Sequence, residues 1–297
     1  MNWIVLSLIA PLFWALTSFV DKYVLGKHSR GLADFVFFSS LGSWLLFFAL
    51  MPFSGMPVLS LRLLIPVATG MMLMYSYWLY GKALGEGDVS TTIILLYKLI
   101  PVVTAALAFA FLGESLAPKE LLGFVIVLAG ATAVSFERGG KLLVPGLPAI
   151  FGVVVLWSVM TLLIDYGLEE IPFWQYLMLD SLGSAVAGLS LFLVPSLRRE
   201  MVAGIRSAGG GKYAWYVGNN LLDFVGQMSV KKAVMLAPAV SLVTLVIQVQ
   251  SFYGIVIGAL LTVLVPQVIR EDISPRSLVR KVIGAAVMFS GIVLLVG

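Results

Sequence analysis

The sequence predicts an all-α integral membrane protein, with ten transmembrane helices arranged as two inverted five-helix repeats. The first observation is composition: of 297 residues, 60% are hydrophobic and 11% are charged, whereas soluble proteins carry roughly 25% charged residues. The second is a series of ten apolar runs, each near the ~20 residues that a spanning helix needs. The third is that elements of the first half recur in the second. Because five is an odd number, two similar halves in series must insert with opposite orientations.

The ten runs follow one another with short connections, which contain proline, glycine and charge at 52–57, at Gly139-Gly140 and from Arg198 to Lys212. No connection is long enough for a soluble domain. The run over 239–265 exceeds one crossing, so we expect a tilted or overhanging helix there. We predict a first repeat at 1–136, a connecting loop at 137–146 and a second repeat at 147–297. The predicted spans are 3–21, 32–51, 62–81, 89–112, 119–136, 147–166, 172–194, 213–234, 239–265 and 276–296.

The internal repeat is visible in short matching elements at similar spacing. Repeats of this kind in an apolar chain are typical of two halves that pack around a shared central site. The matching pairs are Glu114 and Pro118 with Glu271 and Pro275, Gly123 and Gly130 with Gly284 and Gly291, Lys82-Ala83-Leu84 with Lys232-Ala233-Val234, and Val89-Ser90 with Val240-Ser241.

The distribution of lysine and arginine predicts the orientation. The net charge of +4 lies in short connections, which favours membrane orientation over nucleic-acid binding. Connections on one side of the membrane hold 14 of these residues and those on the other side hold 4. The positive-inside rule therefore places both termini outside the cytoplasm of a plasma (inner) membrane. The N-terminus is not a cleavable signal peptide, because it lacks a basic region and has Asp21-Lys22 in place of a cleavage site.

Several chemistries are excluded by the residues present. The chain has no cysteine and one histidine, His28, so no thiolate or zinc site can be built and we expect no metal. There is no DxxxD, HExxH or GxSxG pattern, and no nucleotide-binding GxxxxGK[ST]. We therefore expect no enzyme activity, no cofactor and no use of ATP.

The chain resembles the EamA-domain transporters of the drug/metabolite transporter superfamily. The residues that carry the resemblance are Trp14, Lys82-Ala83-Leu84, Leu112-Gly113-Glu114, Pro118 and the pair Gly123 and Gly130, with second-half counterparts at Glu271, Pro275, Gly284 and Gly291. The second half departs from the pattern where Ile269-Arg270-Glu271 replaces Leu-Gly-Glu.

The resemblance implies two inverted repeats, alternating access and a central cavity. The helices over 3–21, 62–81, 89–112, 147–166, 213–234 and 239–265 would line this cavity. Most relatives are described with both termini in the cytoplasm, whereas the charge distribution predicts the reverse here.

Charged residues within the spans are the strongest functional signals, because a buried charge in a bilayer needs a partner or water. They are Lys98, Asp180 and Asp223. Lys98 can form an ion pair with either aspartate that only fixes packing, or it can serve substrate or coupling. Asp180 precedes small residues suited to close helix packing, so a structural role is favoured there. Asp21-Lys22 and Asp165 are predicted to be solvated or to form gates, and Lys231-Lys232 to reach the membrane interface.

Helical spacing extends the candidate site. Asn219, Asp223, Gln227 and Lys231 recur every four residues and form one stripe. The offset between the repeats places Tyr97 at the position of Gln248, and Tyr77 at that of Gln227. Trp14 and Trp157 occupy nearly equivalent places and can line the cavity or face lipid. The candidate substrate-binding set is Trp14, Tyr77, Tyr97, Lys98, Asn219, Asp223, Gln227 and Gln248.

The predicted function is secondary transport of a small organic metabolite by alternating access, coupled to protons or working as exchange. Lys98 would attract a carboxylate or phosphate, and Asp223 would pair with Lys98 or carry a proton. The alternative is a flippase for a lipid or lipid-linked sugar with the same fold. The expected partners are the substrate and membrane lipids, with no nucleic acid. A homodimer through the glycine-rich faces of 119–136 and 276–296 is the alternative to packing of those glycines within one chain.

Overall fold

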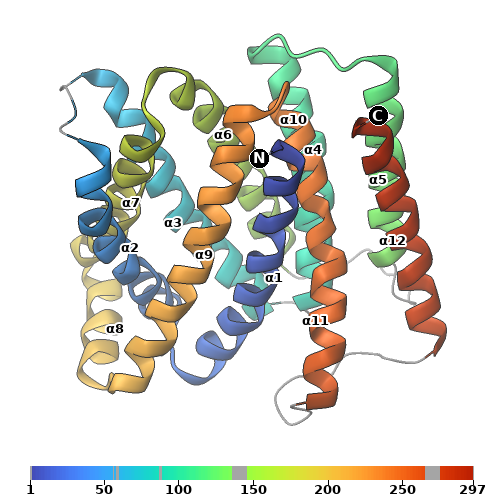
Figure 1. Ribbon diagram of the computed structural model, residues 1–297. Helices are drawn as coiled ribbons and strands as arrows, with labels where there is room; N and C mark the ends of the chain where they lie inside the picture. The colour runs from blue at the N-terminus through green and yellow to red at the C-terminus, as the bar shows by residue number, and fades with distance from the viewer. Residues whose placement is uncertain are drawn as a thin grey trace.

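The computed structural model describes residues 2–55, 57, 60–86, 89–135, 146–264 and 275–296, and these residues form helices and connections without any strand (Figure 1). In the first half the helices are α1 (Trp3–Lys27), α2 (Leu32–Ser54), η1 (Leu61–Leu63), α3 (Leu64–Glu86), α4 (Val89–Phe111) and α5 (Pro118–Ser135). In the second half they are α6 (Leu147–Glu170), α7 (Phe173–Ser190), η2 (Leu191–Leu193), α8 (Pro195–Arg206), α9 (Gly210–Leu236), α10 (Val240–Val246), η3 (Ile247–Val249), α11 (Gln250–Leu264) and α12 (Pro275–Val296).

The predicted all-helical membrane protein is confirmed. Among the described residues, six helical stretches are long and apolar enough to cross a membrane. The crossing of all ten runs and the inverted relation of the two halves stay predictions. The six stretches are Trp3–Lys27, Leu32–Ser54, Leu61–Ala83, Leu147–Glu170, Phe173–Leu193 and Val240–Leu264.

The predicted connection from Arg198 to Lys212 is wrong in one respect, because most of it lies in the helix α8 or begins α9. This helix is amphipathic: Met201 and Gly204 are buried, whereas Arg198 and Arg206 are exposed. A search for continuous apolar runs does not find such a helix, since its signal is periodicity rather than mean hydropathy. It lies at the lower left of Figure 1, away from the ends of the chain.

The long predicted run over 239–265 is interrupted. It consists of α10, the three-residue 3-10 turn η3 and α11. Within it the Gln248 side chain donates from Nε2 to the Thr244 carbonyl oxygen at 2.9 Å. Short 3-10 segments inside a helix often mark a hinge, so this run is suited to bending.

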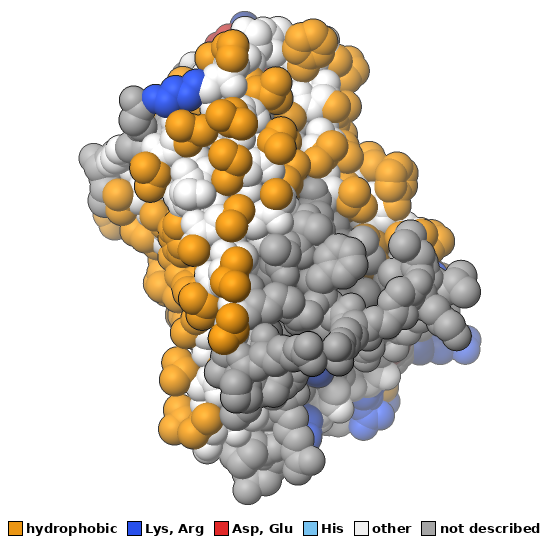
Figure 2. Space-filling view, turned by 90° about the vertical axis from the view of Figure 1, so that its right-hand side faces the viewer, with side chains coloured by type: hydrophobic (Ala, Val, Ile, Leu, Met, Phe, Trp, Pro, Cys, Tyr) orange, Lys and Arg blue, Asp and Glu red, His pale blue; other side chains and the backbone are white. Residues whose placement is uncertain are grey.

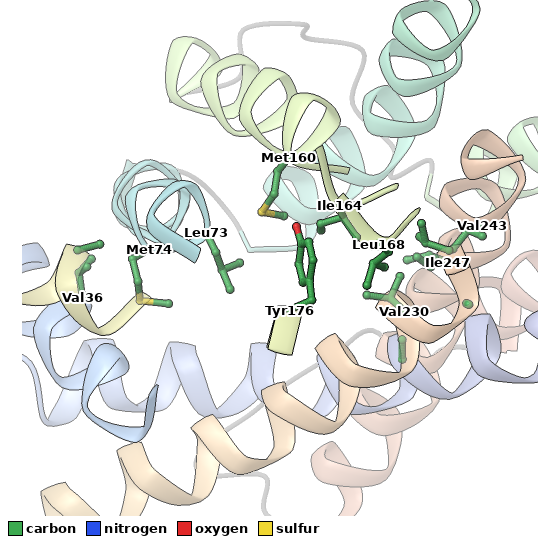
Figure 3. Packing of buried hydrophobic residues seen from close by; sticks show 14 of the residues in the cluster. Val36, Leu73, Met74, Met160, Ile164, Leu168, Tyr176, Val230, Val243 and Ile247 are labelled. Atoms are coloured by element: carbon green, nitrogen blue, oxygen red, sulfur yellow. The ribbon is translucent and has the colours of Figure 1, made fainter. Parts of the chain in front are cut away.

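The core lies between α3, α6, α7 and α9, where buried side chains from both halves of the chain meet (Figure 3). Tyr176 of α7 is fully buried there, and its hydroxyl lies 3.0 Å from Thr69 Oγ1 of α3. Helices α3 and α7 approach closely at glycines: a Cβ on Gly183 would lie 2.0 Å from the Val67 carbonyl oxygen. Small residues at such contacts allow the close backbone packing that holds helices together in membranes.

Helices α5 and α12 pack against each other through their glycines. A Cβ on Gly130 would lie 2.5 Å from the Met288 backbone nitrogen, and one on Gly291 would lie 2.9 Å from the Gly123 carbonyl oxygen. These glycines therefore serve packing within one chain. Figure 2 shows hydrophobic side chains over the outer face of this part of the molecule, as expected for a surface that contacts lipid. They include Leu121, Leu122, Val125, Val282 and Val293.

Candidate functional site

The polar stripe on α9 faces the inside of the bundle. Asn219, Gln227 and Lys231 are buried and Asp223 is half-buried. Because residues four apart lie on the same side of a helix, one helix presents two amides, one carboxylate and one ammonium group to its neighbours. The side chains that meet these groups come from α1, α3 and α7.

Lys231 forms a buried ion pair with Asp180 of α7. The Nζ atom lies 3.0 Å from Asp180 Oδ2 and 3.1 Å from Gln227 Oε1, and Thr69 donates to Asp180 Oδ1 at 2.8 Å. The prediction that Lys231 reaches the membrane interface is wrong, since its side chain is 1% exposed. Because Lys231 belongs to the polar stripe, its side chain faces α7. There the Asp180 carboxylate compensates for the hydration that the buried ammonium group loses.

Asp21 is the second residue whose predicted surroundings are wrong. It is 3% exposed rather than solvated, and Asn219 Nδ2 donates to its Oδ1 at 2.7 Å. The reason is that α1 continues to Lys27, beyond the predicted end at residue 21. Asp21 therefore lies within the helix and faces α9 instead of standing at a helix end.

Two narrow cavities lie at the centre of the bundle. The first, which we call the carboxylate cavity, has a volume of about 30 Å³. The Asp223 carboxylate accepts hydrogen bonds from the side chains of Tyr77 and Gln227. Asp21 lines the same cavity as Asp223. The lining residues are Trp14, Thr17, Ser18, Asp21, Ser76, Tyr77, Tyr80, Trp157, Asp223 and Gln227.

The second, which we call the apolar cavity, has a volume of about 50 Å³. Trp14, Trp157 and Gln227 line both cavities, and the two indole rings lie 6.4 Å apart between centroids. Cavities of these sizes hold a few water molecules at most. A metabolite therefore needs movement of the helices to enter. The other lining residues are Ile100, Met160, Thr161, Ile164, Val230, Val234, Thr244, Ile247 and Gln248.

Some buried polar atoms in or next to the two cavities have no partner in the described part of the chain. Trp14 Nε1, Gln248 Oε1 and Asn219 Oδ1 are buried and have no hydrogen-bond partner among the described residues. Such atoms are uncommon in folded proteins, where they often mark the position of water or a ligand. These atoms are therefore available to a bound molecule once the helices open.

The two indoles differ in their surroundings. Trp157 Nε1 donates to Ser76 Oγ of α3 at 2.6 Å. Trp14 Nε1 instead lies against Gly226 of α9, where a Cβ would approach it to 2.5 Å. The repeat offset between α3 and α9 places Ser76 at the position of Gly226, so one tryptophan has a hydroxyl partner and its counterpart has a glycine.

Glu114, part of the Leu112-Gly113-Glu114 element, caps the start of α10. Its carboxylate accepts from the Val240 backbone nitrogen at 2.6 Å and from Ser241 Oγ at 2.7 Å. A carboxylate at a helix N-terminus satisfies backbone donors that the helix leaves unpaired. The contact ties the connection after α4 to the interrupted run that carries Gln248.

The structure brings together six of the eight predicted site residues. Trp14, Tyr77, Asp223, Gln227 and Gln248 line the two cavities, and Asn219 hydrogen-bonds one of the lining carboxylates. Tyr97 and Lys98 belong to α4, but their side chains lie outside the described residues. That these residues bind a substrate stays a prediction.

Sequence reasoning missed Asp21, Ser76, Thr161 and other lining residues. Asp21 could have been recognised, since it is a carboxylate at the end of an apolar run. Because the predicted span ended at residue 21, Asp21 was interpreted as a residue at a helix end. Within the described part of the chain, no group of histidine, aspartate and glutamate residues that can hold a metal ion is found.

A bundle of apolar helices with polar side chains gathered at its centre is typical of a membrane protein that carries a functional site within the bilayer. Residues 1–136 match the model of the EamA-like transporter family, to which the sequence predicts a resemblance. This match, with several apolar helices, indicates a multi-pass membrane protein, and the matching family implies a transporter of the drug/metabolite type. The family does not favour the alternative of a flippase.

A solved crystal structure of another protein has the same fold. It superposes with a TM-score of 0.67 at 17% sequence identity, over 98% of this chain and 97% of that chain. This likeness shows the fold alone. The comparison with curated proteins gives no match.

Proposed function

We propose that this chain is a secondary transporter that moves a small organic solute by alternating access through the two central cavities. The observation that carries the proposal is that Trp14, Trp157 and Gln227 line both cavities. The two spaces are therefore adjacent parts of one path, which runs between α1, α6 and α9.

The lining favours a solute with an amine at one end and an apolar group at the other. Asp21 and Asp223 present carboxylates to one cavity, and an ammonium group can satisfy both charge and hydrogen bonding there. The other cavity offers indole rings and aliphatic side chains, which favour apolar groups and cations. The sequence-based hypothesis that Lys98 attracts an anion rests on a side chain outside the described residues.

The narrowness of both cavities supports alternating access. Their volumes of about 30 and 50 Å³ leave no room for a metabolite, so the helices must separate on one side at a time. The interruption at η3 provides a place where the run that carries Gln248 can bend. We further propose that Asp223 carries a coupling proton or that the transporter exchanges one solute for another. Both termini are proposed to lie outside the cytoplasm.

A ligand screen by thermal unfolding of the purified protein tests the proposal. Solutes with an amine and an aromatic or aliphatic group are expected to raise the melting temperature, because a ligand at 100 times its dissociation constant adds about 2.7 kcal/mol of stability. Trp14→Phe removes the unpaired indole nitrogen and should weaken the shift. Trp174→Phe is the matched control, since Trp174 is 42% exposed and lies in neither cavity.

Two results would contradict this proposal. One is stabilisation by anionic solutes alone, which would show that the protein binds anions rather than amines. The other is an unchanged ligand response in Trp14→Phe, which would remove the central cavities from substrate binding.

A further inference from the structure

Four arginines surround a shallow depression on the surface of the protein, remote from the central cavities. Arg198, Arg199 and Arg206 come from α8, and Arg30 comes from the connection between α1 and α2. The depression has a volume of about 550 Å³, and its floor includes Val202, Ala203 and Ser207. We call it the arginine depression.

The arrangement follows from the spacing along α8. Arg198, Val202 and Arg206 are four residues apart and share one face. Glu200, the acidic residue of α8, points elsewhere: it accepts a hydrogen bond from the Asp34 backbone nitrogen at 3.1 Å. The arginine face therefore carries positive charge without a carboxylate of its own helix beside it.

These charges are not neutralised by the rest of the described chain. The ion pairs among the described residues are Arg62–Glu170, Lys212–Asp34 and Lys231–Asp180, and none involves the arginine depression. Arg30 is held in place, since its Nε donates to Ser207 Oγ at 2.9 Å, while the other three guanidinium groups are exposed. A guanidinium binds phosphate through two parallel hydrogen bonds, so four of them around one depression match a phosphate group.

The neighbouring side chains place the depression at the level of lipid headgroups. Leu193 and Val194 precede α8 and are 84% and 45% exposed, and Tyr213 and Trp215 near the start of α9 are 39% and 44% exposed. Tyrosine and tryptophan are enriched where a membrane meets water. A cluster of arginines on an amphipathic helix, next to such residues, is typical of a segment that binds anionic lipid.

We propose that the arginine depression binds the phosphate of an anionic phospholipid headgroup. The lipid is held as a partner of the transporter, and its acyl chains extend along the exposed apolar residues that flank α8. The positive-inside rule, to whose count these arginines contribute, predicts that this side of the molecule faces the cytoplasmic leaflet, which is the leaflet rich in anionic lipid.

The bound lipid is connected to the transport path through Asp34. The Asp34 carboxylate accepts from Lys212 Nζ of α9 at 2.7 and 2.9 Å and from the Arg30 backbone nitrogen at 2.8 Å. Gly204 of α8 packs so closely that a Cβ there would lie 2.0 Å from Asp34 Oδ1. The connection after α1, α8 and α9 thus meet at one buried ion pair, and α9 carries the polar stripe of the central site.

The experiment is thermal unfolding in mixed micelles of a neutral detergent with either phosphatidylglycerol or phosphatidylcholine. Phosphatidylglycerol is expected to raise the melting temperature of the wild type, and phosphatidylcholine is not. In the triple variant Arg198→Gln, Arg199→Gln and Arg206→Gln the half-maximal lipid fraction should rise by about fivefold for each arginine removed. The lipid-free melting temperature should stay that of the wild type, because these side chains are exposed.

Two further variants separate the local site from general charge. Lys119→Gln removes one exposed charge at the start of α5 and should keep the full response. The triple variant with lysines at the same three positions keeps the charge and should keep most of the response to phosphatidylglycerol. An unchanged phosphatidylglycerol response in the triple glutamine variant would overturn the proposal. So would an equal response to inorganic phosphate at the same phosphate concentration, since the site would then take a free anion rather than a lipid.

Discussion

Lys231→Met is expected to destabilise the protein by about 3–5 kcal/mol, which is typical of removing one partner of a buried ion pair. Methionine fills nearly the same volume as lysine, so the loss comes from charge rather than from a cavity. Asp180 would keep its hydrogen bond from Thr69 but would lose the ammonium group 3.0 Å away. The measurement is chemical or thermal unfolding of the purified protein in detergent.

The double variant Asp180→Asn with Lys231→Met removes both charges and should recover most of the lost stability. Lys232→Met provides the matched control at the next residue, where the side chain is half-buried and lies over the Phe173 ring at 4.9 Å without a carboxylate. Its effect should stay within about 0.5 kcal/mol. Equal losses in Lys231→Met and Lys232→Met would show that the ion pair does not hold α7 to α9.

Asp223→Asn is expected to weaken binding of an amine-bearing solute by at least tenfold. The substitution keeps shape and most hydrogen bonding but removes the charge, and a hydrogen bond between charged groups contributes about 1.5–3 kcal/mol, or roughly ten- to a hundredfold in affinity. Asp223 is half-buried and faces the carboxylate cavity. The measurement is ligand binding to the purified variant, together with uptake into proteoliposomes under a proton gradient.

Asp165→Asn is the control for this prediction. Asp165 lies near the end of α6 and lines neither central cavity, so its replacement should leave binding unchanged. If Asp223→Asn binds and transports like the wild type, the carboxylate recognises neither substrate nor proton. Loss of uptake with retained binding would assign Asp223 to coupling alone.

The helical fold and much of the central site were predictable from the sequence. The four-residue spacing from Asn219 to Lys231 predicts a stripe on one face, and the offset between the halves places Tyr77 opposite Gln227. Both residues line the carboxylate cavity. These predictions depend only on helical periodicity and on the internal repeat, and both can be recognised in the sequence alone.

The predictions that were wrong concern helix ends and side-chain partners. Asp21 is buried because α1 continues to Lys27, and mean hydropathy locates a helix end only to within several residues. Lys231 pairs with Asp180, 51 residues away in the sequence, and no spacing rule predicts a contact between α7 and α9. The helix α8 was missed because five of its twelve residues are polar, although its amphipathic pattern was visible.

The absence of cysteine from the sequence allows a direct test of alternating access. Ser18→Cys places a single thiol in the carboxylate cavity, and Ser196→Cys places one on exposed α8 as a reference for the side of the membrane. A membrane-impermeant thiol reagent is applied to each side of sealed vesicles in turn, with and without a bound solute. We expect Ser18→Cys to react from both sides, with the solute shifting the two rates in opposite directions, and Ser196→Cys to react from the cytoplasmic side only. Reaction of Ser18→Cys from one side alone under every condition, in protein that still transports, would contradict alternating access through this cavity.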